Sequence, residues 1–221
     1  MDRFRDRIDA GRQLSRSFEG RELRRPVVLG LPRGGVPVAA ELARSLDAPL
    51  DVLVVRKLGL PRQPEVAMGA IGERGARVLN EGVLISGGVA GGDLEAVERR
   101  ERAELESRVA RFRGDAEPVE LDGRTAIIVD DGVATGATAR VACIVARELG
   151  AASVIVAVPV GAADSIAALA ALPEVDEVVC LRAPGDFMAV GLHYIDFRQT
   201  TDEEVQELLR AARRERGDRE P

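Results

Sequence analysis

The chain has 221 residues, 46% of them hydrophobic, which is enough for one α/β domain with a sizeable core. Its net charge of −6, from 31 basic and 37 acidic residues, argues against a nucleic-acid binder, which usually carries a basic excess. No apolar run is long enough to span a membrane, and the charged start, MDRFRDRIDAGRQ, lacks the apolar region of a signal peptide. We therefore expect one domain over residues 1–221 that meets neither nucleic acid nor membrane.

The two cysteines, Cys143 and Cys180, are far apart and have no C-x-x-C spacing. This usage predicts buried thiols in a reducing compartment, which we take to be the cytoplasm, rather than metal ligands or a disulfide.

The first elements predict an anion site. Residues 3–18 place apolar side chains near one helical face, which indicates a docked helix. A strand is expected at 26–31, PVVLGL, and a helix at 38–46. Between them lies Leu-Pro-Arg-Gly-Gly-Val-Pro, where Gly34 and its neighbour expose backbone amides and Arg33 offers a charge-assisted contact. A plain tight turn is the alternative.

The next strand, 50–55, ends in two cations, Arg56 and Lys57, and Lys57 is the only lysine of the chain. Ligands bind at the carboxyl ends of parallel strands, so these cations are expected to face the same crevice as the Arg33 loop. A solvated charged turn is the alternative.

Residues 58–91 show no helical period. Short strands are expected at 66–71 and 77–85, followed by a glycine-rich hinge. Residues 93–112 then predict a long charged helix with a sparse apolar stripe. Either this helix is solvated along the flank of the domain, or it makes a dimer contact.

The stretch 125–138, TAIIVDDGVATGAT, carries the strongest signal in the chain. An apolar strand ends in the acids Asp130 and Asp131, and a small-residue loop leads into a helix near Ala137. The amides and dipole of a helix start favour a phosphate, while paired acids accept hydrogen bonds from sugar hydroxyls and help hold Mg²⁺. The bland alternative is an ordinary strand-to-helix turn in which an Asp caps the helix.

Strands and helices alternate after this stretch, with helices at 138–149 and 164–172 and strands at 153–158 and 177–181. This rhythm predicts an α/β fold with a doubly wound, mainly parallel sheet. Residues 182–199 break the rhythm, and a helix is expected at 202–214. The irregular segment gathers four side chains of interest: Phe187, His193, Tyr194 and Asp196.

The stretch 125–138 resembles the phosphoribosyl-pyrophosphate (PRPP) signature of the type I phosphoribosyltransferases in its order and spacing: apolar strand, two acids, two loop residues, then a small-Thr-Gly-x-Thr turn. The resemblance implies a core at about 26–181, a flexible lid hairpin at about 56–91 and a small C-terminal hood at about 182–199. The charged helix at 93–112 is an insertion relative to the minimal family core.

The resemblance also implies a reaction, in which ribose 5-phosphate passes from PRPP to a nucleobase or other nitrogen acceptor and pyrophosphate leaves. Mg²⁺ is the implied cofactor, with Asp130 and Asp131 on the ribose and, directly or indirectly, on the metal. The remaining implied contacts are Ala134, Thr135, Gly136, Ala137 and Thr138 for the 5′-phosphate, Arg33, Gly34, Arg56 and Lys57 for the pyrophosphate, and Phe187 and Asp196 in the acceptor hood. Of these, Asp130, Asp131, Arg33 and Lys57 are the expected catalytic residues.

Two departures limit what the resemblance implies. In the 6-oxopurine branch, the position of Ala134 holds an Asp that handles the base proton, and an alanine methyl cannot do so. Gly132 replaces a larger apolar residue. The acceptor therefore stays open, as do a homodimer, a non-catalytic regulator that binds PRPP or a nucleotide, and an unrelated metal-dependent phosphate hydrolase. Phe187 is either a stacking platform or a core residue, and His193 fits a structural role better than a catalytic one.

Overall fold

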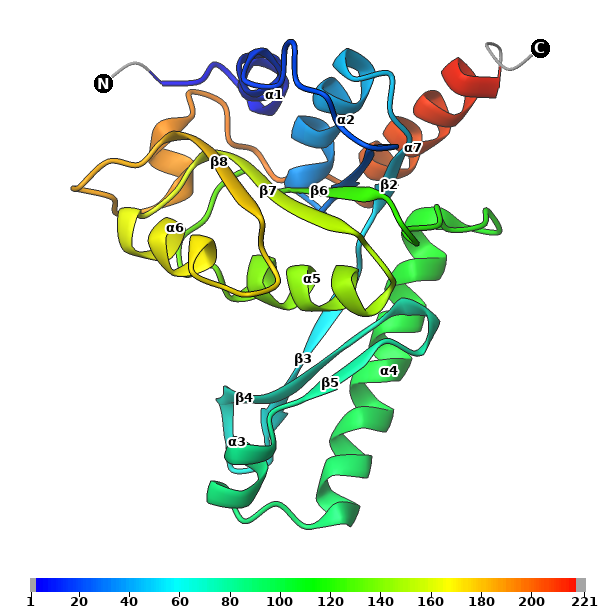
Figure 1. Cartoon of the computed structure of the whole chain (residues 1–221), viewed down its shortest axis with the longest axis vertical. Coiled ribbons are helices and arrows are strands. Elements are labelled where there is room, and N and C mark those ends of the chain that lie inside the picture. Colours follow the sequence, from blue (N-terminus) through cyan, green and yellow to red (C-terminus); the bar gives the residue numbers. More distant parts are fainter. Residues whose placement is uncertain (1–2, 218–221) are drawn as a thin grey trace.

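The computed structural model describes residues 3–217, the side chain of Glu65 excepted. Five parallel strands form the central sheet in the order β2-β1-β6-β7-β8 (Figure 1). Their bounds are β1 Val27–Gly30, β2 Leu50–Val52, β6 Thr125–Val129, β7 Ser153–Val160 and β8 Glu177–Arg182. This confirms the predicted doubly wound α/β fold with a parallel sheet.

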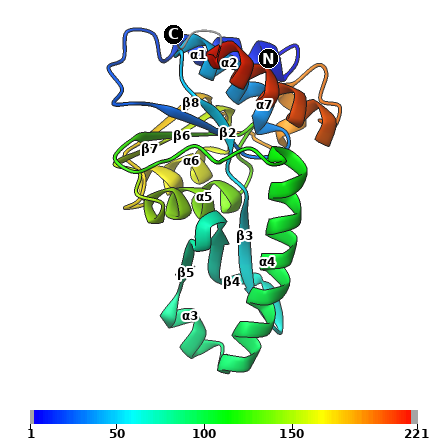
Figure 2. The same ribbon diagram turned by 90° about the vertical axis from the view of Figure 1, so that its right-hand side faces the viewer.

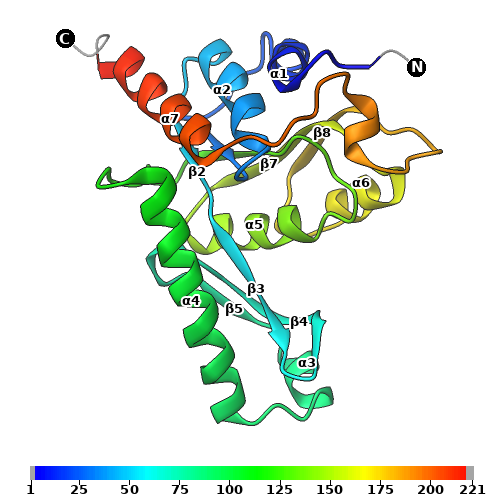
Figure 3. The ribbon, with the colours of Figure 1, turned by 180° about the vertical axis from the view of Figure 1, so that it is seen from behind.

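Helices cover both faces of the sheet, which is why its strands read as continuous apolar runs. On one face lie α1 (Arg7–Arg16), α2 (Gly35–Ser45) and α7 (Asp202–Gly217); on the other lie α5 (Ala137–Glu148) and α6 (Ala163–Ala170) (Figures 1 and 3). Every residue of β1 and β6 is buried as a result.

The strand order changes direction at β1. The chain leaves β1 through α2 and adds β2 on one side, then returns much later to add β6 on the other side. Gly30 pairs with Val129, so β1 and β6 end level with each other. The segments that follow them diverge from this point, and in doubly wound sheets such a point is where ligands bind.

An arm projects from the sheet along the longest axis of the molecule (Figures 1 and 2). It contains an antiparallel sheet of β3 (Val55–Leu60), β4 (Gln63–Gly72) and β5 (Arg77–Leu79), with a short 3₁₀ turn, η1, at Glu73–Gly75. Helices α3 (Glu81–Ser86) and α4 (Gly91–Arg113) complete it.

The strand predicted at 77–85 is wrong beyond Leu79. The side chain of Asn80 accepts a hydrogen bond from the amide of Val83 at 3.1 Å and so caps a short helix, α3, in place of further strand. The apolar residues that suggested a strand, Val83 and Leu84, instead pack against the core from that helix.

Helix α4 belongs to the arm. Its apolar stripe, predicted from the sequence, packs on the arm strands: Val97, Leu105 and Phe112 are buried in the same cluster as Leu58 and Ile71. Its other face is charged and solvated, as expected. The predicted lid and the predicted inserted helix therefore form one unit, while closure of the lid and a dimer contact stay predictions.

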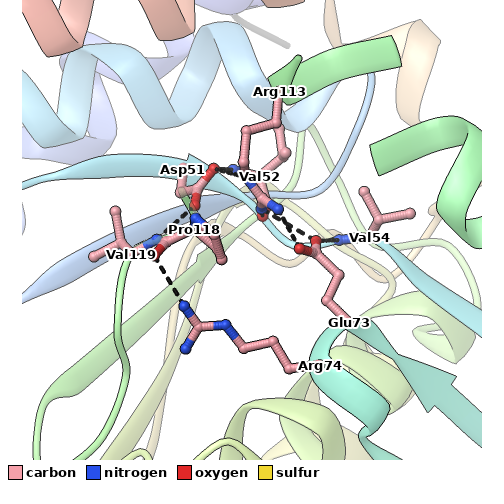
Figure 4. A network of polar contacts seen from close by, with 8 residues as sticks. All are labelled: Asp51, Val52, Val54, Glu73, Arg74, Arg113, Pro118 and Val119. Atoms are coloured by element: carbon pink, nitrogen blue, oxygen red, sulfur yellow. Dashed lines mark hydrogen bonds and ion pairs between the residues drawn. The ribbon is translucent and has the colours of Figure 1, made fainter. Parts of the chain in front are cut away.

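A buried ion cluster joins the arm to the sheet (Figure 4). The Arg113 guanidinium donates to Asp51 of β2 at 3.0 Å, to Glu73 at the base of the arm and to the carbonyl of Val52 at 3.0 Å. The three charged side chains are only 4%, 2% and 8% exposed. Burial alone would lower the pKa of Arg113, but its hydrogen bonds to Glu73 and the charges of Asp51 and Glu73 raise it, so the cation stays charged.

Within residues 3–217, no helix is both long and apolar enough to cross a membrane. Both cysteines are free thiols; Cys143 is buried as predicted, whereas Cys180 is only half-buried. Burial raises the pKa of Cys143 to about 12. A thiol of that kind is a packing residue rather than a nucleophile.

We expect Arg113→Met to lower the free energy of unfolding by about 3–5 kcal/mol, because it leaves two buried carboxylates without their cation. Arg108→Met is the matched control, since Arg108 lies on the same helix in an exposed pair with Glu104, a type worth about 0–1 kcal/mol. Urea unfolding of both variants checks this. Equal losses in the two variants would show that the buried cluster does not hold the arm.

Candidate functional site

The loop between β1 and α2 is the first half of the site. Its Pro32–Arg33 peptide bond is cis. Gly34 is the N-cap of α2 and has no side chain with which to cap it, and the first turn of the helix contains no acid. The dipole of this helix end therefore favours an anion. The amides of its first two residues already donate to backbone carbonyls of the preceding loop. Arg33 lies beside them, 3.5 Å from Asp202 at the start of α7.

The second half of the site follows β6. Asp130 and Asp131 come directly after the strand, and the loop beyond them is held at the end of β7 by a 2.9 Å hydrogen bond from the amide of Val133 to the carbonyl of Val160. The N-cap of α5 is Gly136, whose φ of +73° suits glycine. This second helix start also has no acid in its first turn, and the side chains of Thr135 and Thr138 are exposed.

The two halves touch because glycines leave room for them. A Cβ on Gly34 would lie 2.0 Å from Oδ2 of Asp131, and one on Gly35 would lie 2.4 Å from the carbonyl oxygen of Val129. Any side chain at either position would separate the loop from the acids. The structure thus brings together four of the predicted site residues: Arg33, Gly34, Asp130 and Asp131.

The acid pair is electrostatically strained. Burial and the neighbouring charge of Asp131 raise the pKa of Asp130 well above its ordinary value. Burial also raises the pKa of Asp131, although the guanidinium of Arg7 opposes that shift. Hydroxyl donors or a cation delivered by a ligand would relieve this strain, and perturbed carboxyls in a crevice are typical of functional sites.

The segment predicted to form the hood, residues 182–199, packs against the same acids. The hydroxyl of Tyr194 donates to the carbonyl of Asp131 at 2.6 Å. Val190, in the 3₁₀ turn η2 (Val190–His193), fills the space that Gly132 leaves: a Cβ on Gly132 would lie 2.5 Å from a Val190 methyl. This contact explains why the larger residue expected at position 132 is missing.

The two predicted acceptor residues lie in different surroundings. Phe187 is half-buried and stacks on His193, with ring centroids 5.5 Å apart and an angle of 13° between the planes. Asp196 lines a pocket of about 260 Å³ between the starts of α1, α2 and α7. For both residues, a role in holding an acceptor stays a prediction.

The two predicted pyrophosphate cations of the second strand lie in the arm, on β3. Arg56 binds Glu101 of α4, with nitrogen–oxygen distances of 2.9 and 2.6 Å. Lys57, the next residue, points to the other face of the strand. Pyrophosphate would have to compete with a carboxylate for Arg56, and likewise for Arg33, which lies beside Asp202.

Sequence reasoning missed Arg7, in the first turn of α1. Its Nε and Nη2 lie 2.8 and 2.7 Å from Oδ2 of Asp131. The N-terminal stretch alternates acids and arginines, so nothing in the local pattern distinguishes this arginine from its neighbours. The missed residue therefore enters the site only through the tertiary fold.

Comparison with known proteins decides the family. The family model described as the phosphoribosyl transferase domain matches residues 6–177, which include both halves of the site. The chain belongs to the phosphoribosyl transferase domain family. This confirms the resemblance found in residues 125–138.

Individual relatives agree with this assignment. The chain is 54% identical over 215 residues to proteins of two Mycobacterium tuberculosis strains, CDC 1551 and H37Rv, whose names assign them provisionally to the phosphoribosyl transferases. That alignment covers 97% of this chain but 48% of each relative, so the chain spans about half the length of the curated relatives it matches.

Solved structures extend the comparison. The crystal structure of TT1426 from Thermus thermophilus is 45% identical, with a TM-score of 0.86, and the match covers 94% of this chain and 97% of that one. The coverage is too complete to omit the arm, so the arm is common to both proteins. A hypothetical protein from Neisseria gonorrhoeae with bound ppGpp matches at 13% identity and a TM-score of 0.50, over 93% of this chain and 92% of that one, which shows the fold alone.

We expect Gly34→Ala to lower the free energy of unfolding by about 1–3 kcal/mol, because the new methyl group collides with a carboxylate that Arg7 holds in place. The backbone at Gly34 is αR, which alanine adopts freely, so the cost is steric alone. Gly91→Ala is the control, since a Cβ there meets open space. Urea unfolding curves compare the two, and an unchanged Gly34→Ala midpoint would show that the loop and the acids are not in contact.

Proposed function

We propose that this phosphoribosyl transferase domain transfers ribose 5-phosphate from PRPP to a nitrogen acceptor and releases pyrophosphate. One observation carries the proposal: the Gly34 loop and the Asp131 carboxylate touch, between the starts of α2 and α5. PRPP carries a phosphate, a ribose with free hydroxyls and a pyrophosphate. Two anion-binding helix ends on either side of an acid pair match that order of groups.

Each group of PRPP has a candidate partner. The 5′-phosphate would bind the loop and helix start at Ala134–Thr138, where Gly136 gives the backbone its turn. Asp130 and Asp131 would accept hydrogen bonds from the ribose hydroxyls. Pyrophosphate would lie against Gly34, Arg33, Lys57 and Arg56, and the hood residues Phe187 and Asp196 would face the acceptor.

The reaction breaks the bond between the anomeric carbon and the pyrophosphate oxygen, which keeps the electron pair. The acceptor nitrogen forms the new bond at that carbon from the opposite side and loses its proton. The dipole of α2 and the Arg33 guanidinium would stabilise the charge that builds up on the leaving pyrophosphate. The two acids and the 5′-phosphate loop would hold the ribose in place while this happens.

The acid pair fits Mg²⁺ of the kind that binds through its substrate. Within residues 3–217 no three acids, histidines or cysteines gather into a metal site of their own. Mg²⁺ commonly uses one or two carboxylates and takes its other ligands from phosphates and water. Asp130 and Asp131 would supply those carboxylates, directly or through water, and the ion would neutralise charge on the pyrophosphate.

Calorimetric titration of PRPP with Mg²⁺ tests the donor site, with ribose 5-phosphate as the comparison ligand. We expect micromolar binding, about −8 kcal/mol, and a clear preference for PRPP. Nucleobases and amines can then be screened for pyrophosphate release. Equal weak binding of both ligands would contradict a donor site, and tight PRPP binding without any turnover would favour the regulatory alternative.

Two substitutions separate the two ends of PRPP. Asp131→Asn should weaken the binding of ribose 5-phosphate and of PRPP roughly tenfold or more, because a charge-assisted hydrogen bond is lost. Lys57→Ala should weaken the binding of pyrophosphate and of PRPP and leave the binding of ribose 5-phosphate nearly unchanged. Asp115→Asn, at an exposed position after α4, is the control. The assignment is wrong if both site variants bind and consume PRPP like the parent.

A further inference from the structure

Arg7 is tied to the site at three points. Two of its nitrogens lie within 2.8 Å of Oδ2 of Asp131, and its Nη1 donates to the carbonyl of Arg198 at 2.7 Å. Its guanidinium also lies over the ring of Phe197, 4.0 Å from the centroid. All three nitrogens of the guanidinium are thereby used, and the side chain is 11% exposed. An arginine fixed in this way has little freedom to move.

The contact is one-sided on the carboxylate. Every hydrogen bond that other residues of the described chain donate to the Asp131 carboxylate goes to Oδ2. Apart from the residue's own backbone amide, no described residue donates to its partner oxygen, Oδ1, and the side chain is 15% exposed. A carboxylate held by one oxygen presents the other in a fixed direction. This is the condition for recognising a hydroxyl group by its position and not only by its charge.

The backbone around Arg7 is fixed by the hood. The amide of Phe4 donates to the carbonyl of His193 at 2.9 Å, and the amide of Ile195 donates back to the carbonyl of Phe4 at 2.8 Å. Between them, Tyr194 reaches the carbonyl of Asp131. The residues before α1, the hood and Asp131 therefore form one closed set of contacts, which ends at the carboxylate.

We propose that Arg7 is a positioning residue that sets the selectivity of this site for the ribose hydroxyls, by holding Asp131 with Oδ1 directed at them. The inference rests on the proposed function, because it assumes that Asp131 meets the ribose. It goes beyond that function by giving a role to a residue of α1, outside both strand-end loops. Arg7 acts through Asp131 and does not itself touch the sugar.

A purely structural role makes a different prediction. If Arg7 only stabilised the fold, its loss would weaken the binding of all sugar phosphates by the same factor. If it acted as a latch that blocks Asp131, its loss would strengthen binding. A positioning role changes instead the ratio between ligands that differ at one hydroxyl, because only that contact depends on the direction of Oδ1.

The experiment measures dissociation constants of ribose 5-phosphate, 2-deoxyribose 5-phosphate and xylose 5-phosphate, in which the C2 hydroxyl is absent or the C3 hydroxyl is inverted. The parent should prefer ribose 5-phosphate. In Arg7→Ala the larger of the two preferences should fall roughly tenfold, the value of one hydrogen bond to a charged group. Arg7→Lys, which keeps the charge but not the two-nitrogen contact, should retain part of the preference and covers the case in which Arg7→Ala does not fold.

The matched control is Arg12→Ala, since Arg12 lies on the same helix, is itself exposed and forms an ion pair with Glu41. It should leave all three dissociation constants unchanged. In the double variant Arg7→Ala, Asp131→Asn, the loss of preference should equal that of Asp131→Asn alone, because one residue acts through the other.

The outcomes separate the two proposals. A parent that binds no sugar phosphate overturns the proposed function, and this inference with it. A selective parent whose Arg7→Ala and Arg7→Lys variants keep both preferences overturns the positioning role alone. Tighter binding by Arg7→Ala overturns it as well, in favour of a latch.

Discussion

The guanidinium of Arg113 lies between the carboxylates of Asp51, on the edge strand of the sheet, and Glu73, at the base of the arm. Removing Arg113 would leave two buried carboxylates without a cation, so its contacts hold β2, the base of β4 and α4 in one relative position. Since β3 leaves the sheet directly after β2, the same cluster decides where Arg56 and Lys57 stand. The positions of the two cations predicted to bind pyrophosphate therefore depend on the Arg113 cluster, which would not itself contact a ligand.

At the carboxyl edge of the sheet, the site depends on three glycines that leave space for neighbouring groups. Gly34 makes room for the Asp131 carboxylate, Gly35 for the carbonyl of Val129, and Gly132 for Val190 of the hood. The loop after β1, the acids after β6 and the hood therefore touch in series. A displacement of any one of them moves the next, because groups packed this closely leave no empty space between them. Arg7 closes the series from the side of α1.

Much of this was predictable, and for a physical reason. Strands buried on both faces must be apolar throughout, so β1, β6 and β7 were visible as runs, and two acids at the end of such a run marked the crevice. The glycines were predicted to expose amides, whereas in the structure the amide of Gly35 donates to a backbone carbonyl and the glycines serve to make space. The partner of the α4 stripe could not be predicted, because a stripe does not say which surface it covers. Arg7 was invisible, since its acid lies 124 residues further along the chain.

The crossing of the chain from β1 to β6 also bears on how the molecule assembles. Val27 pairs with Ala126, and the whole arm lies between them in sequence. Closing so long a loop of unfolded chain costs conformational entropy before the contacts between the two strands can offset it. The arm, by contrast, is built mostly from contacts between neighbours in sequence, and once folded it shortens the loop that remains. We expect the arm to form early and the pairing of β1 with β6, which brings the Gly34 loop to the acid pair, to form later.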